Sequence, residues 1–378
     1  MGMGIDLYVP SLPAITHYFH APRQVVQLSI SLYMLGYGVG QLFLGVLSDV
    51  FGRRKLLLYS AFFYTVVSFL AALSPNEYVL NLCRLLQGLG VAGLGSVRRA
   101  IIVDCFSGFE LDKVMTYMSI SWAIGPIIGP FIGGYLQHYF NWRAAFYFFG
   151  LYGFIIWIYT CVVQPETNLY MKPFRVSDFV SSLKMLLTHP AFVFSMVILG
   201  ITYSNLVIFN VVGPFLIQNV LHYSVVAYGK IALILGLGYF SGNFLNRILI
   251  QFINPLRIVL VGLLGTILIS AIMLFLGIWV PINLLIILLP VIVLNALCGL
   301  VFPNLTSLCL GIFPKIAGTA SAVFGAVVAL CVFMMSSFAA LLKTSSQMPL
   351  ALMYGGLAVV CLVLFVLMRR LSFLPMHR

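Results

Sequence analysis

Charged residues are scarce in this sequence, and acidic residues are the scarcest. Only 7% of the 378 residues are Asp, Glu, Lys or Arg, and Asp and Glu together number eight. A soluble domain carries roughly 25% charged residues, so this chain has too few to cover a surface that faces water. The scarcity argues against a soluble enzyme and against a nucleic-acid-binding domain.

Several motifs of metal binding and catalysis are also missing. The seven cysteines stand singly among apolar residues, without a CxxC pair or a histidine at metal-ligand spacing, so we expect buried small side chains. The sequence has no HExxH, no GxSxG and no Gly-rich phosphate loop that ends in Lys and Ser or Thr. We therefore expect no metal, no cofactor and no enzymatic activity, and energy from an ion gradient or the substrate's own gradient.

Hydrophobic residues make up 62% of the chain, and they form continuous runs of helical length. One crossing of a bilayer requires about 20 apolar residues in a helix. The runs predict eleven complete spans, at residues 24–46, 56–73, 77–97, 113–138, 143–163, 190–216, 225–248, 257–277, 281–310, 317–342 and 348–368. The fold class is therefore predicted to be an all-α membrane protein.

One polar stretch divides these spans into two groups. Residues 166–189 are predicted to form a central cytoplasmic loop between an N-terminal half, 1–165, and a C-terminal half, 190–378. The first thirteen residues, MGMGIDLYVPSLP, read like the outer end of a further span. We therefore expect a twelve-helix molecule in which helix 1 is truncated at its N-terminus, through a start assigned too late or a real truncation.

Most basic residues fall in loops on one side of the predicted membrane. Loops rich in Lys and Arg face the cytoplasm, so this side is assigned to the cytoplasm. If the loop at 47–55 is cytoplasmic, only Arg23, Arg143 and Lys343 among the loop cations lie outside. The net charge of +12 is thus a topology signal, and we expect no nucleic-acid partner. The pattern predicts a multi-pass membrane protein with a cytoplasmic C-terminus.

A demanding motif follows the first complete span, Gly45-Val-Leu-Ser-Asp49-Val-Phe-Gly52-Arg53-Arg54-Lys55. Glycine permits a short turn between two helices, and a carboxylate such as Asp49 can meet a helix N-terminus or the arginines. The motif resembles the loop between helices 2 and 3 of the major facilitator superfamily, although Val50 stands where that family usually has a basic residue. The alternative interpretation is an ordinary topology-determining loop.

Two further stretches carry the same resemblance. Leu80-Asn-Leu-Cys-Arg84-Leu-Leu-Gln87-Gly88-Leu-Gly90 looks like the family's helix-4 motif, with its membrane-embedded arginine. Gly125-Pro126-Ile-Ile-Gly129-Pro130-Phe-Ile-Gly133-Gly134-Tyr-Leu136 looks like the helix-5 motif of the antiporter branch. Glycines four residues apart form one helix face that a neighbouring helix can approach closely, and simple small-residue packing explains the same spacing.

More narrowly, Gly4-Ile-Asp6-Leu-Tyr8-Val-Pro10-Ser-Leu-Pro13 is similar to the end of helix 1 in the bicyclomycin-resistance (Bcr/CflA) drug:proton antiporters. The resemblance covers most of residues 4–165 and implies a major facilitator fold of two six-helix halves, located in the bacterial cytoplasmic (inner) membrane. It also implies that substrate binds between the halves, which rock around it.

Asp6 is the one acidic residue that the span assignment places in the hydrocarbon region. Burial favours the protonated form of a carboxyl group, which suits a proton carrier. We expect Asp6 to be the proton-coupling residue and Arg84, with Gln87, to belong to the substrate or coupling network. Asp6 in a solvated position at the outer interface, and Arg84 bonded to backbone carbonyls in a structural role, are the alternatives.

The predicted function is a proton-coupled efflux transporter, an antiporter of drugs or other lipophilic small molecules. Its expected partners are the small-molecule substrate, protons and the lipid bilayer, and it is expected to be a monomer. One alternative is a major facilitator transporter of a specific metabolite or siderophore. The other is an inactive remnant or scaffold.

Overall fold

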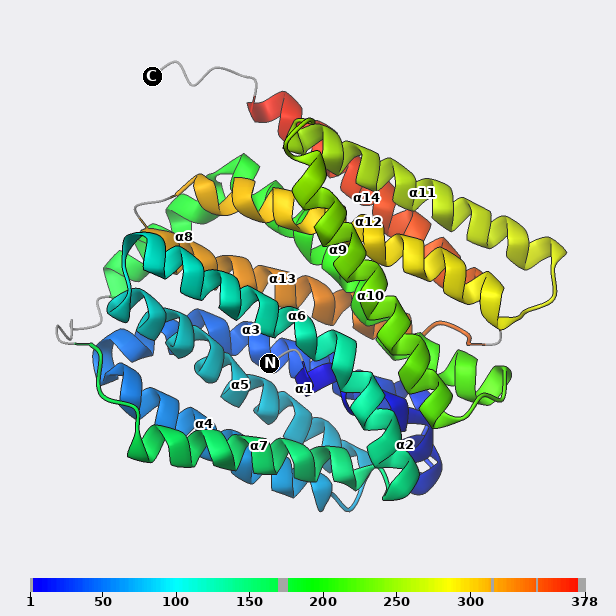
Figure 1. The fold of residues 1–378 in the computed structure, drawn as a ribbon, viewed down its shortest axis with the longest axis horizontal. Helices are drawn as coiled ribbons and strands as arrows, with labels where there is room; N and C mark the ends of the chain where they lie inside the picture. The colour runs from blue at the N-terminus through cyan, green and yellow to red at the C-terminus, as the bar shows by residue number, and fades with distance from the viewer. Residues whose placement is uncertain (1–2, 169–175, 314–315, 345, 373–378) are drawn as a thin grey trace. The chain divides into compact units, whose positions relative to one another are not determined.

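The computed structural model describes residues 3–168, 176–313, 316–344 and 346–372, and within these ranges every regular element is helical. Eleven long helices follow the order of the predicted spans (Figure 1). They are α3 (Arg23–Phe51), α4 (Arg53–Ala72), α5 (Glu77–Cys105), α6 (Gly108–Tyr139), α7 (Arg143–Val162), α9 (Pro190–Phe215), α10 (Val225–Leu249), α11 (Pro255–Trp279), α12 (Leu284–Gly311), α13 (Ala317–Ala340) and α14 (Met348–Ser372).

Ten helices in the described ranges are long and apolar enough to cross a membrane. Of the eleven long helices, α6 is the one outside this set. It is rich in glycine and proline between residues 125 and 134, and its 32 residues exceed the about 20 that a crossing needs. The prediction of eleven spans therefore corresponds to ten apolar helices and a glycine-rich eleventh.

The sequence predicted that the N-terminal residues form the outer end of one further span. In the structure this segment is divided. It forms three short elements, α1 (Met3–Asp6), the 3-10 turn η1 (Val9–Ser11) and α2 (Leu12–Phe19). Pro10 and Pro13 lie in the first turn of η1 and α2 respectively, where the missing N–H of proline is tolerated. The prolines thus start new elements and divide the segment.

Part of the predicted central loop is also helical. Residues Val176–Thr188 form α8, since apolar residues such as Phe179, Leu183 and Leu186 recur at helical spacing. Leu186 is fully buried, which shows that this helix has a packed face. Lys172 and Arg175 of the predicted loop lie outside the described residues, as do Lys315 and Arg378.

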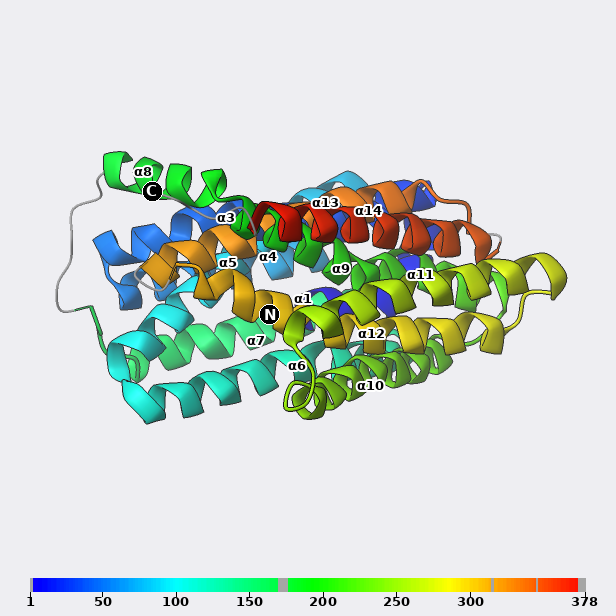
Figure 2. The ribbon, with the colours of Figure 1, turned by 90° about the horizontal axis from the view of Figure 1, so that it is seen from above.

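The chain folds into two compact units. The first comprises Met1–Asp178 with Val225–Gly229, and the second comprises Phe179–Ser224 with Lys230–Arg378. In the first unit, α5 packs against α3 and α4, α4 packs against α7, and α6 contacts α1 and η1. In the second unit, α9 contacts α12, α13 and α14, while α11 lies beside α12 and α14, as Figures 1 and 2 both show.

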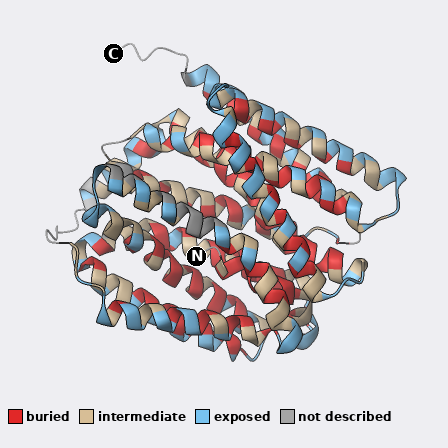
Figure 3. Ribbon diagram, in the orientation of Figure 1, coloured by how far each residue is buried: buried red, intermediate tan, exposed pale blue. Residues whose placement is uncertain are grey.

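Many of the exposed residues of these helices are large and apolar, and Figure 3 marks the exposed positions along the ribbon. On α11 the exposed large apolar residues include Val261, Leu264, Leu268, Ile272 and Phe275, which recur every three or four positions. Buried polar residues, including Thr266 and Ser270, lie on other faces of the same helix. This arrangement, with an apolar outside, is the one expected of a helix that faces lipid.

Candidate functional site

The candidate site in the first unit is centred on Arg84 of α5, whose side chain is completely buried. Its Nη1 donates a hydrogen bond to Oε1 of Gln87 at 2.8 Å, and its Nη2 donates to the carbonyl oxygen of Gly4, also at 2.8 Å. Gln87 in turn donates from Nε2 to Oγ of Ser68 on α4 at 2.8 Å. Arg84 therefore connects α1, α4 and α5 through a buried polar chain.

Two tyrosine rings complete the surroundings of this guanidinium. Its Cζ lies 4.3 Å from the ring centre of Tyr8 and 4.3 Å from that of Tyr33. A cation between two aromatic faces is stabilised electrostatically, and more so where water is excluded. The Tyr8 hydroxyl is fixed in turn by a 2.8 Å hydrogen bond with Ser29. These contacts hold a buried cation in one orientation.

Asp6, the predicted proton-coupling residue, is the last residue of α1 and is only 8% exposed. It packs against the glycine face of α6, where a β-carbon added at Gly129 would lie 3.1 Å from the Asp6 Cβ. One turn further, a β-carbon at Gly133 would overlap the carbonyl oxygen of Leu7. The glycines of the predicted helix-5 motif therefore let the Asp6 segment approach the α6 backbone.

The other motif residues of α6 surround this contact. Gly125, Pro130 and Gly134 are buried and Pro126 is half-buried, with both prolines inside the helix. The sequence identified this motif and identified Asp6, but it contained no signal that the two lie face to face. Arg84 contacts the short helix α1 that carries Asp6, because its guanidinium donates to the carbonyl oxygen of Gly4.

A cavity of about 490 Å³ adjoins this cluster within the first unit. It extends from Gly4 along α5, α6 and α7, and its aromatic lining residues are Tyr64, Phe148, Phe149, Tyr152 and Tyr159. Arg98 is the one charged residue among the described residues that line it, and Gln164 adds a polar group. Its size falls in the roughly 300–1,000 Å³ range of small-molecule sites.

The predicted signature loop is shorter than the sequence indicated. We predicted a loop at 47–55, but α3 continues to Phe51 and α4 begins at Arg53, so Gly52 alone separates them. Gly52 adopts φ 92°, a conformation that side-chain-bearing residues rarely adopt. Polar residues at the helix ends had marked the loop, yet they are accommodated in the last and first helical turns. Gly45, in contrast, lies inside α3 and faces Ser96.

Arg53 is the hub of a polar network at this junction. Its guanidinium pairs with Asp49 in the preceding turn, with Asp104 of α5 at an Nε–Oδ2 distance of 3.0 Å, and with the Ser48 hydroxyl. Arg54 donates from Nη2 to the carbonyl oxygen of Cys161 on α7 at 2.8 Å. The expectation that Asp49 meets the arginines is thus met by the Asp49–Arg53 pair.

Glu166 is a residue that sequence reasoning assigned to the central loop and did not connect with this network. Its carboxylate accepts hydrogen bonds from the backbone N–H of Arg53 at 2.8 Å and of Arg54 at 3.1 Å. Those N–H groups begin α4 and have no partner within the helix. Glu166 therefore caps α4 from a position more than a hundred residues away. An acidic residue just beyond a predicted span was the signal in the sequence, and it was not specific enough to predict a helix cap.

In the parts of the chain that are described, no three His, Cys, Asp or Glu side chains converge. The groups that converge are hydrogen-bonded helix ends, a buried cation and an aromatic cavity. This arrangement suits the binding and movement of a small molecule or proton.

Comparison with known proteins identifies relatives among transporters. An uncharacterized transporter of Rickettsia bellii is 30% identical over 259 residues, 68% of this chain and 64% of that protein. A bicyclomycin resistance protein homolog of Haemophilus influenzae is 24% identical over 96% of this chain and 91% of its own length. The chloramphenicol resistance protein CraA of Acinetobacter baumannii is 28% identical over 69% of this chain and 63% of CraA. The chain thus spans less than two thirds of the length of the Rickettsia and Acinetobacter relatives.

Solved structures agree with the fold. The D-xylose–proton symporter superposes with a TM-score of 0.74 at 14% identity over 96% of this chain and 94% of that one. The inward-open xylose transporter XylE from E. coli also gives 0.74, at 16% identity over 99% and 93%. The family model for the Major Facilitator Superfamily matches residues 1–336. This chain therefore belongs to the major facilitator superfamily of membrane transporters, with relatives among the bicyclomycin-resistance type of drug transporters.

Proposed function

We propose that this protein is a proton-coupled antiporter that exports drugs or other lipophilic small molecules across the bacterial cytoplasmic membrane. The names of its relatives support drug export, since they include resistance proteins for bicyclomycin and chloramphenicol and several multidrug transporters. The aromatic lining of the first-unit cavity suits a flat lipophilic molecule. In this proposal the C-terminus faces the cytoplasm and the molecule acts as a monomer.

The observation that carries the proton-coupling proposal is the position of Asp6. Its carboxyl group is buried, lies against Gly129, and belongs to the same short helix whose Gly4 carbonyl binds Arg84. The charge of a carboxylate in such surroundings is expensive, so gain or loss of a proton changes the electrostatic energy of this segment strongly. Asp6 is therefore the group through which we expect protons to act.

The contact with α6 gives that proton a mechanical consequence. Glycines present a smooth surface, so the Asp6 segment can shift along α6 without lifting side chains out of the way. We infer that protonation of Asp6 weakens its attraction to the Arg84 cluster and permits such a shift. Deprotonation restores the attraction and resets the cycle.

The proposal is tested with the full chain in proteoliposomes that carry an imposed pH gradient. Asp6→Asn is expected to abolish gradient-driven ethidium transport, and Asp6→Glu is expected to retain part of it. Glu110→Gln is a matched control, because Glu110 is an exposed acid in the first turn of α6. Full transport by Asp6→Asn, with the same dependence on the gradient, would overturn the proposed role of Asp6.

A transporter of one specific anionic metabolite is the second candidate. The observation in its favour is Arg98, the single charged residue among the described ones that line the cavity. A panel of neutral dyes and of small carboxylates, assayed in the same vesicles, separates the two candidates. Transport of carboxylates alone, lost in Arg98→Gln, would establish the metabolite transporter. No transport of any compound by a stably inserted protein would point to an inactive remnant or scaffold.

A further inference from the structure

The second unit contains no acidic residue. All eight Asp and Glu residues of the sequence lie at or before Asp178. The second unit comprises Phe179–Ser224 and Lys230–Arg378. Its described basic residues are Lys184, Lys230, Arg247, Arg257, Lys343, Arg369 and Arg370. A basic residue there has no carboxylate side chain within its own unit with which to pair.

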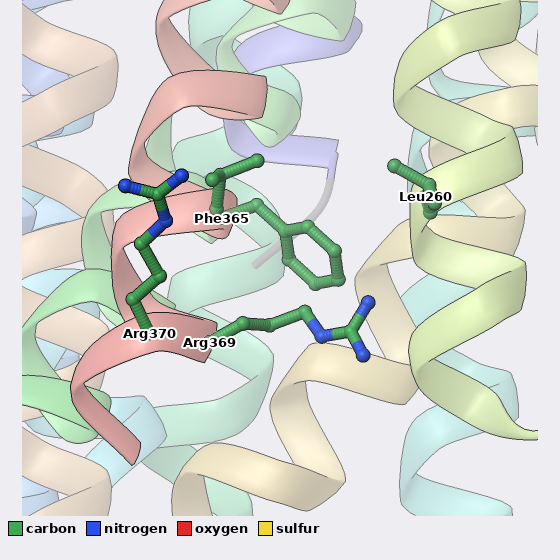
Figure 4. A pocket seen from close by; sticks show the side chains of 5 residues that line it. Leu260, Phe365, Arg369 and Arg370 are labelled. Carbon is green, nitrogen blue, oxygen red and sulfur yellow. The ribbon is translucent and has the colours of Figure 1, made fainter. Parts of the chain in front are cut away.

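Two of these cations, Arg369 and Arg370, border a pocket between α11 and α14. Its other lining residues are Leu260 of α11 and Phe365 and Val366 of α14, and its volume is about 490 Å³. Figure 4 shows Arg369 reaching below Phe365 toward α11, while Arg370 extends on the other side of α14. The apolar lining is thus bordered by Arg369 on the side of α11 and by Arg370 on the opposite side of α14.

Both guanidinium groups are available to a ligand. Arg369 and Arg370 are exposed, and neither forms a hydrogen bond or ion pair with any residue that the structure describes. Phe365 is only 1% exposed, so it supplies a fixed wall. The pocket therefore offers positive charge without a competing internal anion.

The start of α11 adds to this positive potential. Arg257 lies in the first turn of α11, three residues before Leu260, and is exposed. The N-terminus of a helix also favours anions, because its first N–H groups and its dipole point outward. Because α11 and α14 are packed together, their basic ends lie at the same edge of the unit as the pocket.

We propose that this pocket binds an anionic phospholipid of the surrounding bilayer, with its phosphate on Arg369, an acyl chain against Leu260, Phe365 and Val366, and Arg370 adding positive charge at the rim. Guanidinium groups bind phosphate through charge-assisted hydrogen bonds. Basic pockets between transmembrane helices are suited to acidic lipid head groups. Phosphate is the shared chemistry of a lipid head group and the free ion, and the apolar lining favours the lipid.

The test measures lipid binding to the purified full chain by native mass spectrometry, with phosphatidylglycerol and phosphatidylcholine as probes. The wild-type protein is expected to retain phosphatidylglycerol in preference to phosphatidylcholine. Arg369→Gln with Arg370→Gln is expected to weaken phosphatidylglycerol binding roughly thirtyfold, since each basic residue near a membrane surface contributes about fivefold. Lys343→Gln is the matched control, because Lys343 is an exposed cation of the same unit away from this pocket.

Two further arms separate the sources of the phosphate and guard against misfolding. Leu260→Trp, which fills the apolar part of the pocket and keeps both arginines, is expected to reduce lipid binding as well. Excess inorganic phosphate is expected to leave the bound lipid in place, and its displacement of the lipid would reassign the pocket to the free ion. Equal binding of the two lipids, or unchanged phosphatidylglycerol binding by the folded double variant, would overturn the proposal.

Discussion

Asp6 lies directly against Gly129, so close that a β-carbon at position 129 would come within 3.1 Å of the β-carbon of Asp6. One helical turn further along α6, Gly133 faces the backbone of Leu7 even more closely. The short helix that carries the buried acid is therefore seated on glycine backbone, with no side chain of α6 between them at these positions. This relationship makes the glycine motif and the acid a single structural feature.

The first prediction concerns this contact. Gly133→Ala is expected to destabilise the protein by about 2 kcal/mol, because its β-carbon overlaps the Leu7 carbonyl and forces the two segments apart. Gly129→Ala is expected to have a smaller effect, since 3.1 Å requires only a slight displacement. Thermal unfolding in detergent, monitored by circular dichroism, measures both.

Gly356→Ala provides the control for helix propensity. A β-carbon at Gly356 in α14 meets no atom within 4 Å, so alanine is expected to be neutral or slightly stabilising. If Gly133→Ala melts at the same temperature as Gly356→Ala, the close approach of α1 and α6 is wrong.

The second prediction concerns Arg84. Arg84→Lys is expected to lower stability by on the order of 3 kcal/mol, because a lysine ammonium lacks the planar group that stacks between Tyr8 and Tyr33 and donates to two acceptors. Chemical unfolding in mixed micelles, together with vesicle transport, measures the loss.

Arg143 gives a close comparison for that substitution. Its guanidinium also lies over two rings, at 4.5 Å from Tyr18 and 4.4 Å from Trp142, and donates to the Tyr18 hydroxyl. This hydrogen bond is exposed, so Arg143→Lys is expected to cost less than about 1 kcal/mol. Similar losses for the two variants would contradict the view that burial makes Arg84 critical.

The third prediction concerns the capping of α4 by Glu166. Glu166→Gln removes one acceptor oxygen and the negative charge from the α4 N-terminus, so we expect a loss of about 1 kcal/mol. Hydrogen exchange of the backbone amides of Arg53 and Arg54 is expected to speed up, while that of the α7 interior is unchanged. Unaltered exchange at both amides in Glu166→Gln would show that the cap contributes nothing; Glu110→Gln serves as the control.

The fourth prediction uses the cysteines to test orientation. Cys105, at the end of α5 beside Asp104, is exposed, whereas Cys83, Cys298 and Cys309 are buried. A membrane-impermeant maleimide is expected to label Cys105 in inverted vesicles and to leave it unlabelled in intact cells, because the proposed topology puts this end in the cytoplasm. Cys105→Ser identifies the labelled site. Labelling in intact cells would reverse the assigned topology.

The sequence determined the helices because length and hydropathy are local properties. Each long apolar run became a helix, although α3 and α5 continue about five and eight residues beyond their predicted ends. Family motifs around Asp49, Arg84 and Gly129 were visible as strings of residues. Local reasoning was less accurate at boundaries. It read the polar residues near Gly52 as a loop, although helical turns at a membrane surface accommodate such residues, and it missed the breaks that Pro10 and Pro13 introduce.

Tertiary structure decided which of these residues meet. The seat of Asp6 on Gly129, the two rings around Arg84 and the cap that Glu166 places on α4 each join residues far apart in the chain. Such contacts depend on which helices become neighbours and how each is rotated, and hydropathy carries no information on either. The absence of acids after Asp178 was plain in the sequence, but only the packing of α11 beside α14 placed Arg369 and Arg370 above an apolar pocket.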